Sequence, residues 1–322
     1  MSSDREVFKI AVLDDYQNVA LSMADWSALD GRAAITVFHD HLSDIDALID
    51  RLQAFEVVCV MRERTPMTRE VISRLPKLRL IASTAPRNAS IDLTAAAERG
   101  IEIVHTGYSS SPTVELTWAL ILASVRNLVA ENAALRTGGW QRRVGEDLNG
   151  KTLGVLGLGN IGSAVARIGK AFGMQVIAWS QNLTVERAAE MGAALVSKEE
   201  LFRRADILTI HLVLSGRTRG LVTNRELTLM KPSARLVNTS RGAIVVEADL
   251  IAALQAGKIA GAAVDVFDHE PLSADHPFRS LTNLLATPHI GYVSRDLYTR
   301  FYADTVKNIG QWIDRQNRPL AG

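Results

Sequence analysis

Cysteine is almost absent from this sequence, which contains a single one, Cys59, among 322 residues. A lone cysteine cannot close an internal disulfide, which excludes a disulfide-stapled scaffold and fits a reducing cytoplasm. Because Cys59 lies in the apolar run Val57 to Met61, we expect it to be a buried strand residue.

An excess of charge of either sign is also missing. The formal net charge is +1 with 22% charged residues, so the sequence offers no basic surface for nucleic acid or a membrane. Long apolar runs are missing too: the first residues, MSSDREVFKIAV, lack a signal-peptide core, and no run approaches the about 20 residues of a membrane-spanning helix. We therefore expect a cytoplasmic protein with neither a nucleic-acid nor a membrane partner.

What remains is ordinary for a globular chain, with 47% hydrophobic residues and a length sufficient for two domains with separate cores. In the first hundred residues short apolar runs alternate with helical stretches. Strands are expected at 7–13, 35–38, 57–60, 78–82 and 101–104, and helices at 45–52, 69–74 and 93–99. Thr68 and Asp92 are expected to cap helices. This alternation predicts a parallel, doubly wound sheet.

After a polar break at 109–112, residues Thr113 to Arg136 are expected to form one long helix that ends at Gly138-Gly139. From residue 185 the strand–helix alternation resumes, with strands expected at 194–196, 206–212, 235–238, 260–264 and 284–286. The last stretch, Asp296 to Arg315, is amphipathic and has no strand beside it. We expect this helix to pack back on the first domain.

The stretch TLGVLGLGNIGSAVARIGKAFG, residues 152–173, predicts a strand, a glycine turn and a helix, and a second strand follows at 175–179. Gly157 permits the tight turn, Gly159 lets a pyrophosphate approach the backbone, and Gly162 lets the helix pack closely. The helix N-terminus offers free N–H groups to phosphates. This unit therefore predicts dinucleotide binding.

Charged residues follow three of the later strands, in the loops beginning Asn238-Thr239, Asp265-Val266 and Thr287-Pro288. Parallel strands bring their carboxyl ends to one edge of a sheet, where ligands bind. We therefore group Arg241, Glu270 and His289.

This grouping suits the reduction of a 2-oxo acid. A histidine supplies a proton near neutral pH, a carboxylate stabilises the imidazolium, and an arginine grips the substrate carboxylate. His289 is the expected acid/base, Glu270 its partner and Arg241 the substrate clamp. His211 ends a strand on the same side and is expected to line the cofactor groove. The other histidines are expected to be structural, and no Cys/His spacing suggests a metal site.

The segments GLGNIG, HLVLSGRTRGLV, NTSRGAIV, AAVDVFDHEP and TPHIGY resemble the ordered motifs of the D-isomer-specific 2-hydroxyacid dehydrogenases, which include phosphoglycerate dehydrogenases and glyoxylate/hydroxypyruvate reductases. The resemblance implies two doubly wound parallel-sheet α/β domains: a Rossmann cofactor domain, residues 106–293, inserted in a flavodoxin-like substrate domain, residues 1–105 and 294–322. It also implies a homodimer formed largely through the cofactor domains.

By position in these motifs, Arg241, Glu270 and His289 match the catalytic Arg, Glu and His of the family. Asp265 matches an acidic residue that meets the nicotinamide carboxamide. The remaining cofactor contacts implied are Asn160, Ile161, His211, Thr218, Thr239, Ser240 and Gly291. Formate-oxidising relatives usually have glutamine at the position of Glu270, so the carboxylate favours hydroxyacid chemistry.

The sequence departs from the pattern of NAD enzymes after the second strand of the cofactor unit, where an acidic residue usually binds the ribose 2′-OH. The segment here is Trp179-Ser180-Gln181-Asn182. Ser180 offers a hydroxyl to the ribose, yet no arginine follows at once to bind a 2′-phosphate. We expect NAD, with NADP or dual use open.

A second departure is Thr84-Ala85-Pro86-Arg87, where relatives have a glycine-containing loop whose N–H groups bind the substrate carboxylate. Proline has no N–H to donate. Either Arg87 replaces the backbone donors, beside Thr84, or it points to solvent. Arg62 and Arg64, after the Cys59 strand, are further candidates for binding a second anionic group.

The predicted function is hydride transfer between NAD(P)(H) and C2 of a small D-2-hydroxy or 2-oxo acid. Two alternatives stay open. One is a nucleotide-sensing, corepressor-like binding protein on the same fold, and the other is a dehydrogenase of an unusual substrate such as phosphite. Fold alone does not decide between them.

Overall fold

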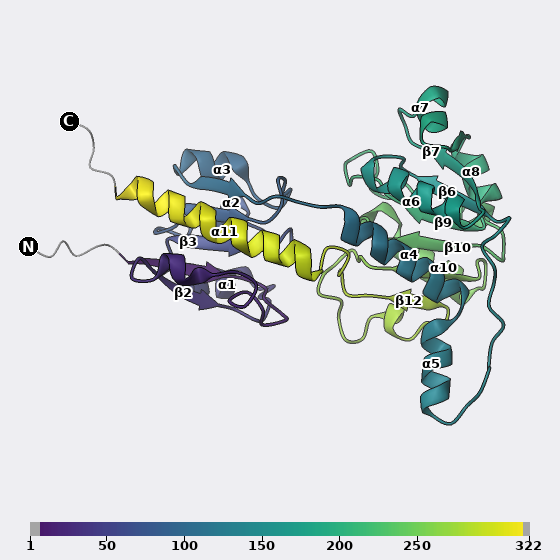
Figure 1. Ribbon diagram of the computed structural model, residues 1–322, viewed down its shortest axis with the longest axis horizontal. Helices are drawn as coiled ribbons and strands as arrows, with labels where there is room; N and C mark the ends of the chain where they lie inside the picture. Colours follow the sequence, from purple (N-terminus) through teal and green to yellow (C-terminus); the bar gives the residue numbers. More distant parts are fainter. Residues whose placement is uncertain (1–6, 318–322) are drawn as a thin grey trace, which may run out of the picture. The chain divides into compact units, whose positions relative to one another are not determined.

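The computed structural model describes residues 7–317, which form two compact units. Unit 1 consists of the described residues up to Ser109 and those from Val293 onward, and unit 2 is the segment from Ser110 to Tyr292. The chain therefore leaves unit 1 once and returns to it once. Each unit is an α/β structure built on one parallel sheet (Figure 1).

The sheet of unit 1 has five strands in the order β2-β1-β3-β4-β5. Their bounds are β1 Phe8–Val12, β2 Ala33–Val37, β3 Val57–Val60, β4 Leu80–Ser83 and β5 Glu102–His105. Strands β3 and β4 are buried at every position, as strands covered on both faces are. The order 2-1-3-4-5 is that of flavodoxin-like sheets and confirms the predicted fold.

Three helices, α1 Ile45–Leu52, α2 Arg69–Ser73 and α3 Leu93–Glu98, pack on one face of this sheet. Each begins after an N-cap residue whose side chain accepts a backbone N–H from the first turn of the helix. These N-cap residues are Asp44, Thr68 and Asp92 respectively. The two caps predicted from the sequence, Thr68 and Asp92, are thereby confirmed.

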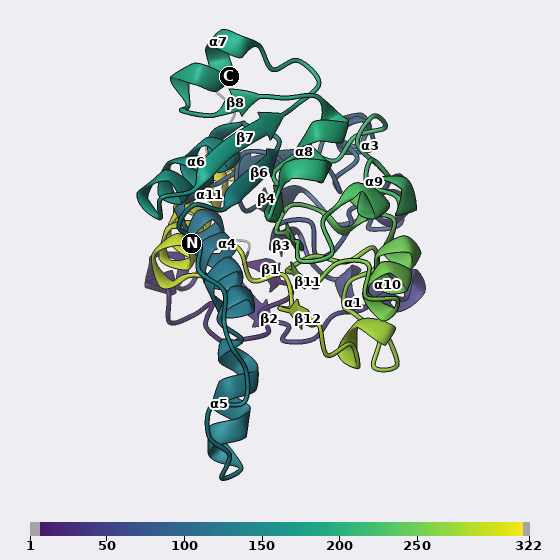
Figure 2. The ribbon, with the colours of Figure 1, turned by 90° about the vertical axis from the view of Figure 1, so that its right-hand side faces the viewer.

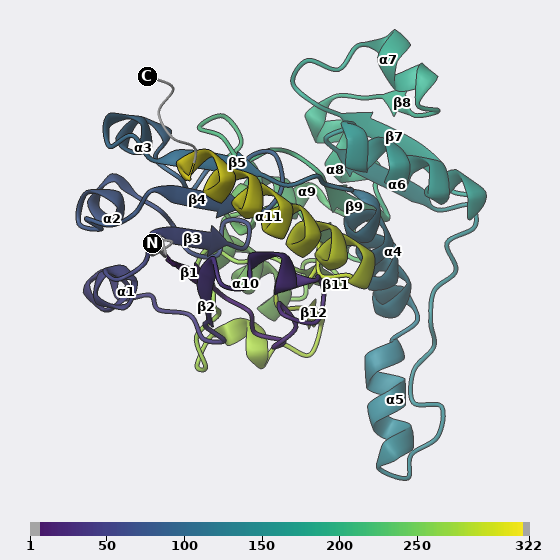
Figure 3. The same ribbon diagram turned by 60° about the vertical axis from the view of Figure 1, so that its left-hand side comes forward.

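The other face of the unit 1 sheet is covered by the C-terminal helix α11, Arg295–Gln316 (Figure 3). The ring of Trp312, 1% exposed, packs edge-on against Phe8 of β1 with centroids 4.9 Å apart. Asn308 donates a 2.9 Å hydrogen bond to the carbonyl of His105 at the end of β5. The prediction that this helix returns to the first domain is confirmed. The 3-10 turn η1, Trp26–Leu29, was not predicted.

The sheet of unit 2 has seven strands in the order β12-β11-β10-β9-β6-β7-β8. Their bounds are β6 Thr152–Leu156, β7 Gln175–Trp179, β8 Ala194–Leu195, β9 Ile207–Ile210, β10 Arg235–Asn238, β11 Gly261–Val264 and β12 Leu284–Ala286. Reading from β8 to β11 gives the 3-2-1-4-5-6 order of the Rossmann fold, with β12 added at the edge. The chain thus changes direction across the sheet between β6 and β9.

Helices cover both faces of this sheet (Figure 2). On one face lie α4 Ser111–Val125, α6 Asn160–Ala171 and α7 Val185–Glu190, and on the other α8 Lys198–Arg204, α9 Asn224–Leu229 and α10 Glu247–Gln255. Two apolar cores result, one on each side of the strands.

The single helix predicted over residues 113–136 is wrong. The structure has two helices, α4 and α5 (Leu128–Arg136), bent by 62° at a break where Asn127 takes a left-handed conformation with φ 53°. Asparagine tolerates this conformation better than other non-glycine residues. No single helix within residues 7–317 is apolar and long enough to cross a membrane, and α4 and α5 meet that requirement only as a bent pair.

Candidate active site

The glycine turn between β6 and α6 has the geometry that a dinucleotide requires. A Cβ on Gly162 would lie 2.0 Å from the carbonyl oxygen of Gly157, so only glycine allows α6 to start against the turn. A Cβ on Gly159 would meet no atom within 4 Å, so the backbone there faces open space.

The first turn of α6 leaves its amides available. The first bond accepted within the helix runs from Ser163 N–H to the carbonyl of Gly159 at 2.8 Å. The N–H groups of Asn160, Ile161 and Gly162 have no acceptor in the part of the chain that the structure describes. Free amides and the positive end of the helix dipole suit a pyrophosphate, so these residues fit the cofactor that the sequence predicted.

Ser180, directly after β7, is joined to the same turn. Its Oγ accepts the N–H of Leu158 at 3.0 Å, while the carbonyl of Trp179 accepts the N–H of Gly157 at 2.9 Å. The Ser180 hydroxyl therefore fixes the turn and keeps its own proton to donate. The sequence alone did not indicate this first role.

His211 and Thr218 both lie in the loop that follows β9. Burial lowers the pKa of His211 to about 3, and its Nε2 lies 2.9 Å from the hydroxyl of Thr209. The Thr218 hydroxyl donates to the carbonyl of Val213 at 2.7 Å and so closes the loop. The Val213 side chain is 84% exposed, an apolar surface at this edge that sequence reasoning missed.

The loop after β10 is held by its own side chains. Asn238 donates to the carbonyl of Arg241 at 3.0 Å and accepts the N–H of Ser240 at 3.0 Å. The Thr239 hydroxyl lies 2.8 Å from that of Thr117 on α4, and Ser240 Oγ bonds the carbonyl of Leu212. Arg241, partly buried, donates from Nη1 to the carbonyl of Ser240 at 2.7 Å.

Asp265, directly after β11, is fully buried and organises the loop that follows β12. Its Oδ1 accepts the hydroxyl of Thr287 at 2.6 Å and the N–H of Ile290 at 2.8 Å. Its Oδ2 accepts the N–H of Gly291 at 2.8 Å. Burial raises the pKa of Asp265, and these donors and the nearby His289 work in the opposite direction. The carboxylate therefore fixes the backbone on the C-terminal side of His289.

His289 and Glu270 are in direct contact. Nδ1 of His289 lies 2.5 Å from Oε2 of Glu270, and the side chains are 21% and 32% exposed. The other carboxylate oxygen, Oε1, accepts the N–H of Phe267 at 3.0 Å. His289 itself has a left-handed backbone with φ 51°, and its ring packs edge-on against Tyr292 with centroids 5.5 Å apart. A neutral or charged His289 therefore presents Nε2 away from the carboxylate.

The sheet register explains this meeting. Asn238 pairs with Val264, and Val264 pairs with Ala286, so the three loops leave the sheet side by side. The grouping made from sequence rested on this parallel arrangement. The structure shows contact between His289 and Glu270.

In unit 1, Arg62 and Arg87 follow neighbouring strands. The Thr84 hydroxyl, buried at 4% exposure, accepts the N–H of Arg62 at 2.8 Å. The Arg62 guanidinium donates to the carbonyl of Arg87 at 3.3 Å and lies over the Tyr108 ring, 5.6 Å from its centroid. The side chain of Arg87 is exposed. Thr84 thus faces inward, and the two arginines adjoin at the carboxyl edge of β3 and β4.

The loop that follows β4 and carries Arg87 has few free backbone N–H donors. Ala85 adopts φ 65°, and its N–H is taken by the hydroxyl of Thr106 at 2.8 Å. Pro86 has no N–H. The donors that a glycine-containing loop would offer are therefore absent from these two residues.

Comparison with known proteins accounts for this set of features. The family model for the NAD binding domain of D-isomer specific 2-hydroxyacid dehydrogenases matches residues 118–291. A glyoxylate reductase from Aeropyrum pernix is 43% identical over 250 residues, which cover 74% of this chain and 75% of that protein. A D-3-phosphoglycerate dehydrogenase from Methanocaldococcus jannaschii is 41% identical over 250 residues, 76% of this chain but only 47% of that longer protein.

Among solved structures, a phosphoglycerate oxidoreductase from Vibrio cholerae superposes with a TM-score of 0.90 at 38% identity, covering 96% of this chain and 100% of that one. The family match covers more than half of the chain and includes the glycine turn and all three strand-end loops. The chain therefore belongs to the D-isomer specific 2-hydroxyacid dehydrogenases and is an NAD(P)-dependent oxidoreductase, as its motifs predicted.

Proposed function

We propose that the protein interconverts a D-2-hydroxy acid and its 2-oxo acid with His289 and Glu270 as the acid/base pair and Arg241 as the clamp for the substrate carboxylate. The observation that carries this proposal is the 2.5 Å contact between His289 Nδ1 and Glu270 Oε2. It fixes the tautomer with the proton on Nδ1 in the neutral ring, so that Nε2 exchanges the proton with substrate.

The chemistry divides between cofactor and protein. When bound, the nicotinamide supplies or accepts the hydride at C2 of the substrate. His289 holds at Nε2 the proton that the carbonyl oxygen gains in reduction, and the Glu270 charge stabilises the imidazolium that carries it. Arg241 binds the substrate carboxylate through charge-assisted hydrogen bonds. Formate oxidation needs no proton on a carbonyl oxygen, so Glu270 favours hydroxyacid chemistry.

We assign the pyrophosphate to the turn of Gly157, Gly159 and Gly162 and the amides of α6. Ser180 donates to a ribose hydroxyl. The other proposed cofactor contacts are His211, Thr218, Thr239, Ser240, Asp265 and Gly291. Because the segment 179–182 carries no cation for a 2′-phosphate, we expect NAD to be preferred over NADP. The ratio of kcat/KM for NADH to that for NADPH measures this preference.

Unit 1 is proposed to be the substrate domain and unit 2 the cofactor domain. With Pro86 in place of a backbone donor, Arg87 supplies the positive charge at the carboxyl edge of β3 and β4. Arg62 adjoins it through the Arg87 carbonyl at 3.3 Å. Thr84 acts on substrate indirectly, since its buried hydroxyl fixes the backbone of Arg62. Two guanidinium groups there favour a 2-oxo acid with a second anionic group.

The direct test is a panel of 2-oxo acids with NADH and NADPH, followed by the loss of absorbance of the reduced cofactor. The panel contains glyoxylate, pyruvate and phenylpyruvate, and compares them with hydroxypyruvate and 2-oxoglutarate. Turnover establishes the reaction class, and a preference for 2-oxoglutarate over phenylpyruvate supports the second-anion assignment. Cofactor binding without any turnover would instead favour the nucleotide-sensing alternative or an unusual substrate such as phosphite.

The role of His289 has its own test. Exchange of His289 for Asn keeps a polar side chain but removes the proton donor at Nε2. We expect kcat to fall by about 100-fold or more while the NADH affinity, read by fluorescence, stays within about twofold. Turnover that survives this exchange rules out His289 as the acid/base.

A homodimer is proposed because α5 and the segment after it expose apolar side chains. None of the residues of α5 is buried, and this part extends away from the rest of unit 2 (Figures 1 and 2). Leu128 and Leu135 are 52% and 59% exposed, Trp140 is 74% exposed and Val144 is 95% exposed. Apolar side chains at this density mark a contact surface rather than a solvated arm.

The same unit carries a groove lined by Leu122, Val125 and Phe172 together with polar residues of 146–149. We propose that, in a twofold dimer, residues 128–144 of each copy occupy this groove on the other copy. We expect light scattering to give twice the chain mass, and exchange of Trp140 for Ser to shift it toward monomer. A wild-type chain that stays monomeric at micromolar concentration contradicts the homodimer.

Burial raises the pKa of the Cys59 thiol to about 12, so this thiol is inert and compatible with the proposed cytoplasmic location.

A further inference from the structure

Unit 2 contains a second carboxylate–histidine pair, Glu247 and His276. Glu247 is the first residue of α10, and His276 precedes the 3-10 turn η3, Pro277–Arg279. Oε1 of Glu247 lies 2.9 Å from Nε2 of His276, and the side chains are only 21% and 16% exposed. The sequence placed His276 among the structural histidines and gave Glu247 no role.

The hydrogen-bond network determines the tautomer of His276. Its Nδ1 accepts the N–H of Phe278 at 3.2 Å, so in the neutral ring the proton is on Nε2 and is donated to Glu247. The ring also packs edge-on against Phe278 with centroids 4.9 Å apart. Hydrogen bonds at both ring nitrogens therefore fix His276, and His276 in turn fixes the position of Glu247 Oε1.

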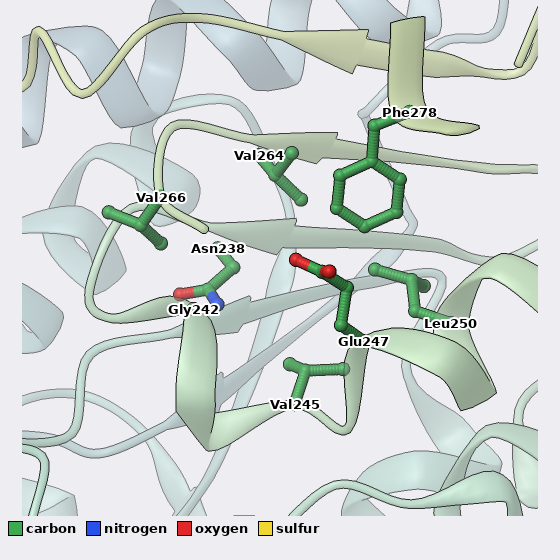
Figure 4. Close-up of a pocket in the computed structure, with 8 residues that line it drawn as sticks. All are labelled: Asn238, Gly242, Val245, Glu247, Leu250, Val264, Val266 and Phe278. Atoms are coloured by element: carbon green, nitrogen blue, oxygen red, sulfur yellow. The ribbon is translucent and has the colours of Figure 1, made fainter. Parts of the chain in front are cut away.

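The second oxygen of Glu247 faces the loop that carries Glu270. Oε2 lies 3.4 Å from the N–H of Asp268, a long hydrogen bond. Burial and the Glu247 charge both raise the pKa of the Asp268 carboxyl, and the charges of His269 and Arg219 lower it. Figure 4 shows the Glu247 side chain directed into a small pocket lined by Val264 and Phe278 among others.

The peptide between Phe267 and Asp268 is also held from the Arg241 loop. A Cβ on Gly242 would lie 2.2 Å from the carbonyl carbon of Phe267 and 2.6 Å from the nitrogen of Asp268. The N–H of Phe267 in turn donates to Oε1 of Glu270 at 3.0 Å. The 267–268 peptide thus lies against the backbone of Gly242, next to Arg241, and its N–H donates to the Glu247 carboxylate. The N–H of the preceding peptide, that of Phe267, donates to Glu270, which contacts His289.

We propose that Glu247 and His276 are positioning residues that hold the 267–268 peptide so that Glu270 meets His289. The inference rests on the proposed roles of Glu270 and His289. A purely structural reading makes Glu247 an acid in the first turn of α10, where the helix dipole favours it. That reading requires neither a fixed histidine tautomer nor a contact with Asp268, and it predicts a loss of stability without a change in chemistry.

The variants are Glu247→Gln and His276→Ala, with His276→Gln as the conservative exchange, because a glutamine amide can still donate to Glu247. Glu226→Gln is the matched control, since Glu226 is a first-turn acid of α9 that bonds Thr223 and Lys198 and does not contact the Glu270 loop. Two readouts are compared: amide hydrogen exchange of residues 265–272 in the cofactor-free protein, and kcat with KM for the preferred 2-oxo acid.

For Glu247→Gln and His276→Ala we expect the rate of hydrogen exchange at the amides of Phe267 and Asp268 to rise about tenfold. We expect kcat to fall about tenfold with KM within about twofold, because a misplaced Glu270 weakens proton transfer more than substrate binding. His276→Gln recovers most of both readouts, and Glu226→Gln changes neither.

The proposal is overturned if both variants keep the wild-type rate of amide hydrogen exchange in residues 265–272, or if their kcat stays within about twofold of the wild type. If one variant fails to fold, the other carries both readouts. A wild type that reduces no 2-oxo acid refutes the proposed function, and the exchange readout then still decides whether Glu247 holds the 267–268 peptide.

Discussion

His211 makes the stability of unit 2 depend on pH in a way that can be worked out from its burial. Its pKa falls from 6.5 to about 3 because the buried ring is poorly solvated when charged. In the unfolded chain the imidazole binds a proton below pH 6.5, whereas in the folded chain it stays neutral down to about pH 3. Protons therefore favour the unfolded state, and stability is lost as the pH falls through this range.

The size of the effect follows from about 1.4 kcal/mol for each pKa unit. Between pH 6.5 and pH 5 the loss is about 2 kcal/mol. Exchange of His211 for Gln removes the titrating group while keeping a polar atom near Thr209. The difference in free energy of unfolding between variant and wild type should therefore move by about 2 kcal/mol, in favour of the variant, between pH 8 and pH 5.

The assay is urea unfolding of the cofactor-free protein at pH 8, 6.5 and 5, with exchange of the exposed His269 for Gln as a control in the same unit. Differences between proteins at each pH cancel the titration of shared carboxylates. A difference for His211→Gln that stays constant with pH refutes the reasoning, because it means that the folded ring takes up its proton as readily as the unfolded one.

Three further exchanges test the site and the fold. Arg241→Ala should raise KM for the 2-oxo acid by about 100-fold and lower kcat as well, since it removes a charge-assisted clamp, and unchanged kinetics would exclude that role. Gly162→Ala places a Cβ 2.0 Å from the Gly157 oxygen, so NADH titration should show binding weakened by about tenfold or more; normal affinity would contradict the turn geometry. Trp312→Ala removes a fully buried ring from its contact with Phe8 and should cost about 3–5 kcal/mol of unfolding free energy, and a loss below about 1 kcal/mol would mean that α11 packs loosely.

Local signals explain what could be predicted from the sequence. The β6–turn–α6 unit was identifiable because a short apolar run, three spaced glycines and a helical repeat adjoin within the segment 152–173. The meeting of Glu270 and His289 was predictable because each follows a strand and parallel strands end at one edge. Neither inference needed knowledge of distant contacts.

Two kinds of feature escaped prediction: a local break decided by one residue, and contacts between residues that are distant in the chain. The break at Asn127 lies inside an otherwise continuous helical pattern, and a single left-handed residue decides it. The hydrogen bonds of Asp265 to the His289 loop span more than twenty residues. The pairing of Glu247 with His276 joins a helix start to a turn 29 positions away. No periodicity or spacing rule reports such pairs.

The insertion of unit 2 within unit 1 has a consequence for synthesis on the ribosome. The first five strands leave the ribosome early, but α11, which covers one face of their sheet, follows only after the whole of unit 2. At about 5–20 residues per second, the roughly 180 intervening residues delay it by about 10–40 s. Throughout that time the apolar face that receives Trp312 is uncovered, while the strands of unit 2 are still being synthesised. The nascent chain is thus most exposed to aggregation in its oldest part, and a premature stop before residue 295 would leave that face open permanently.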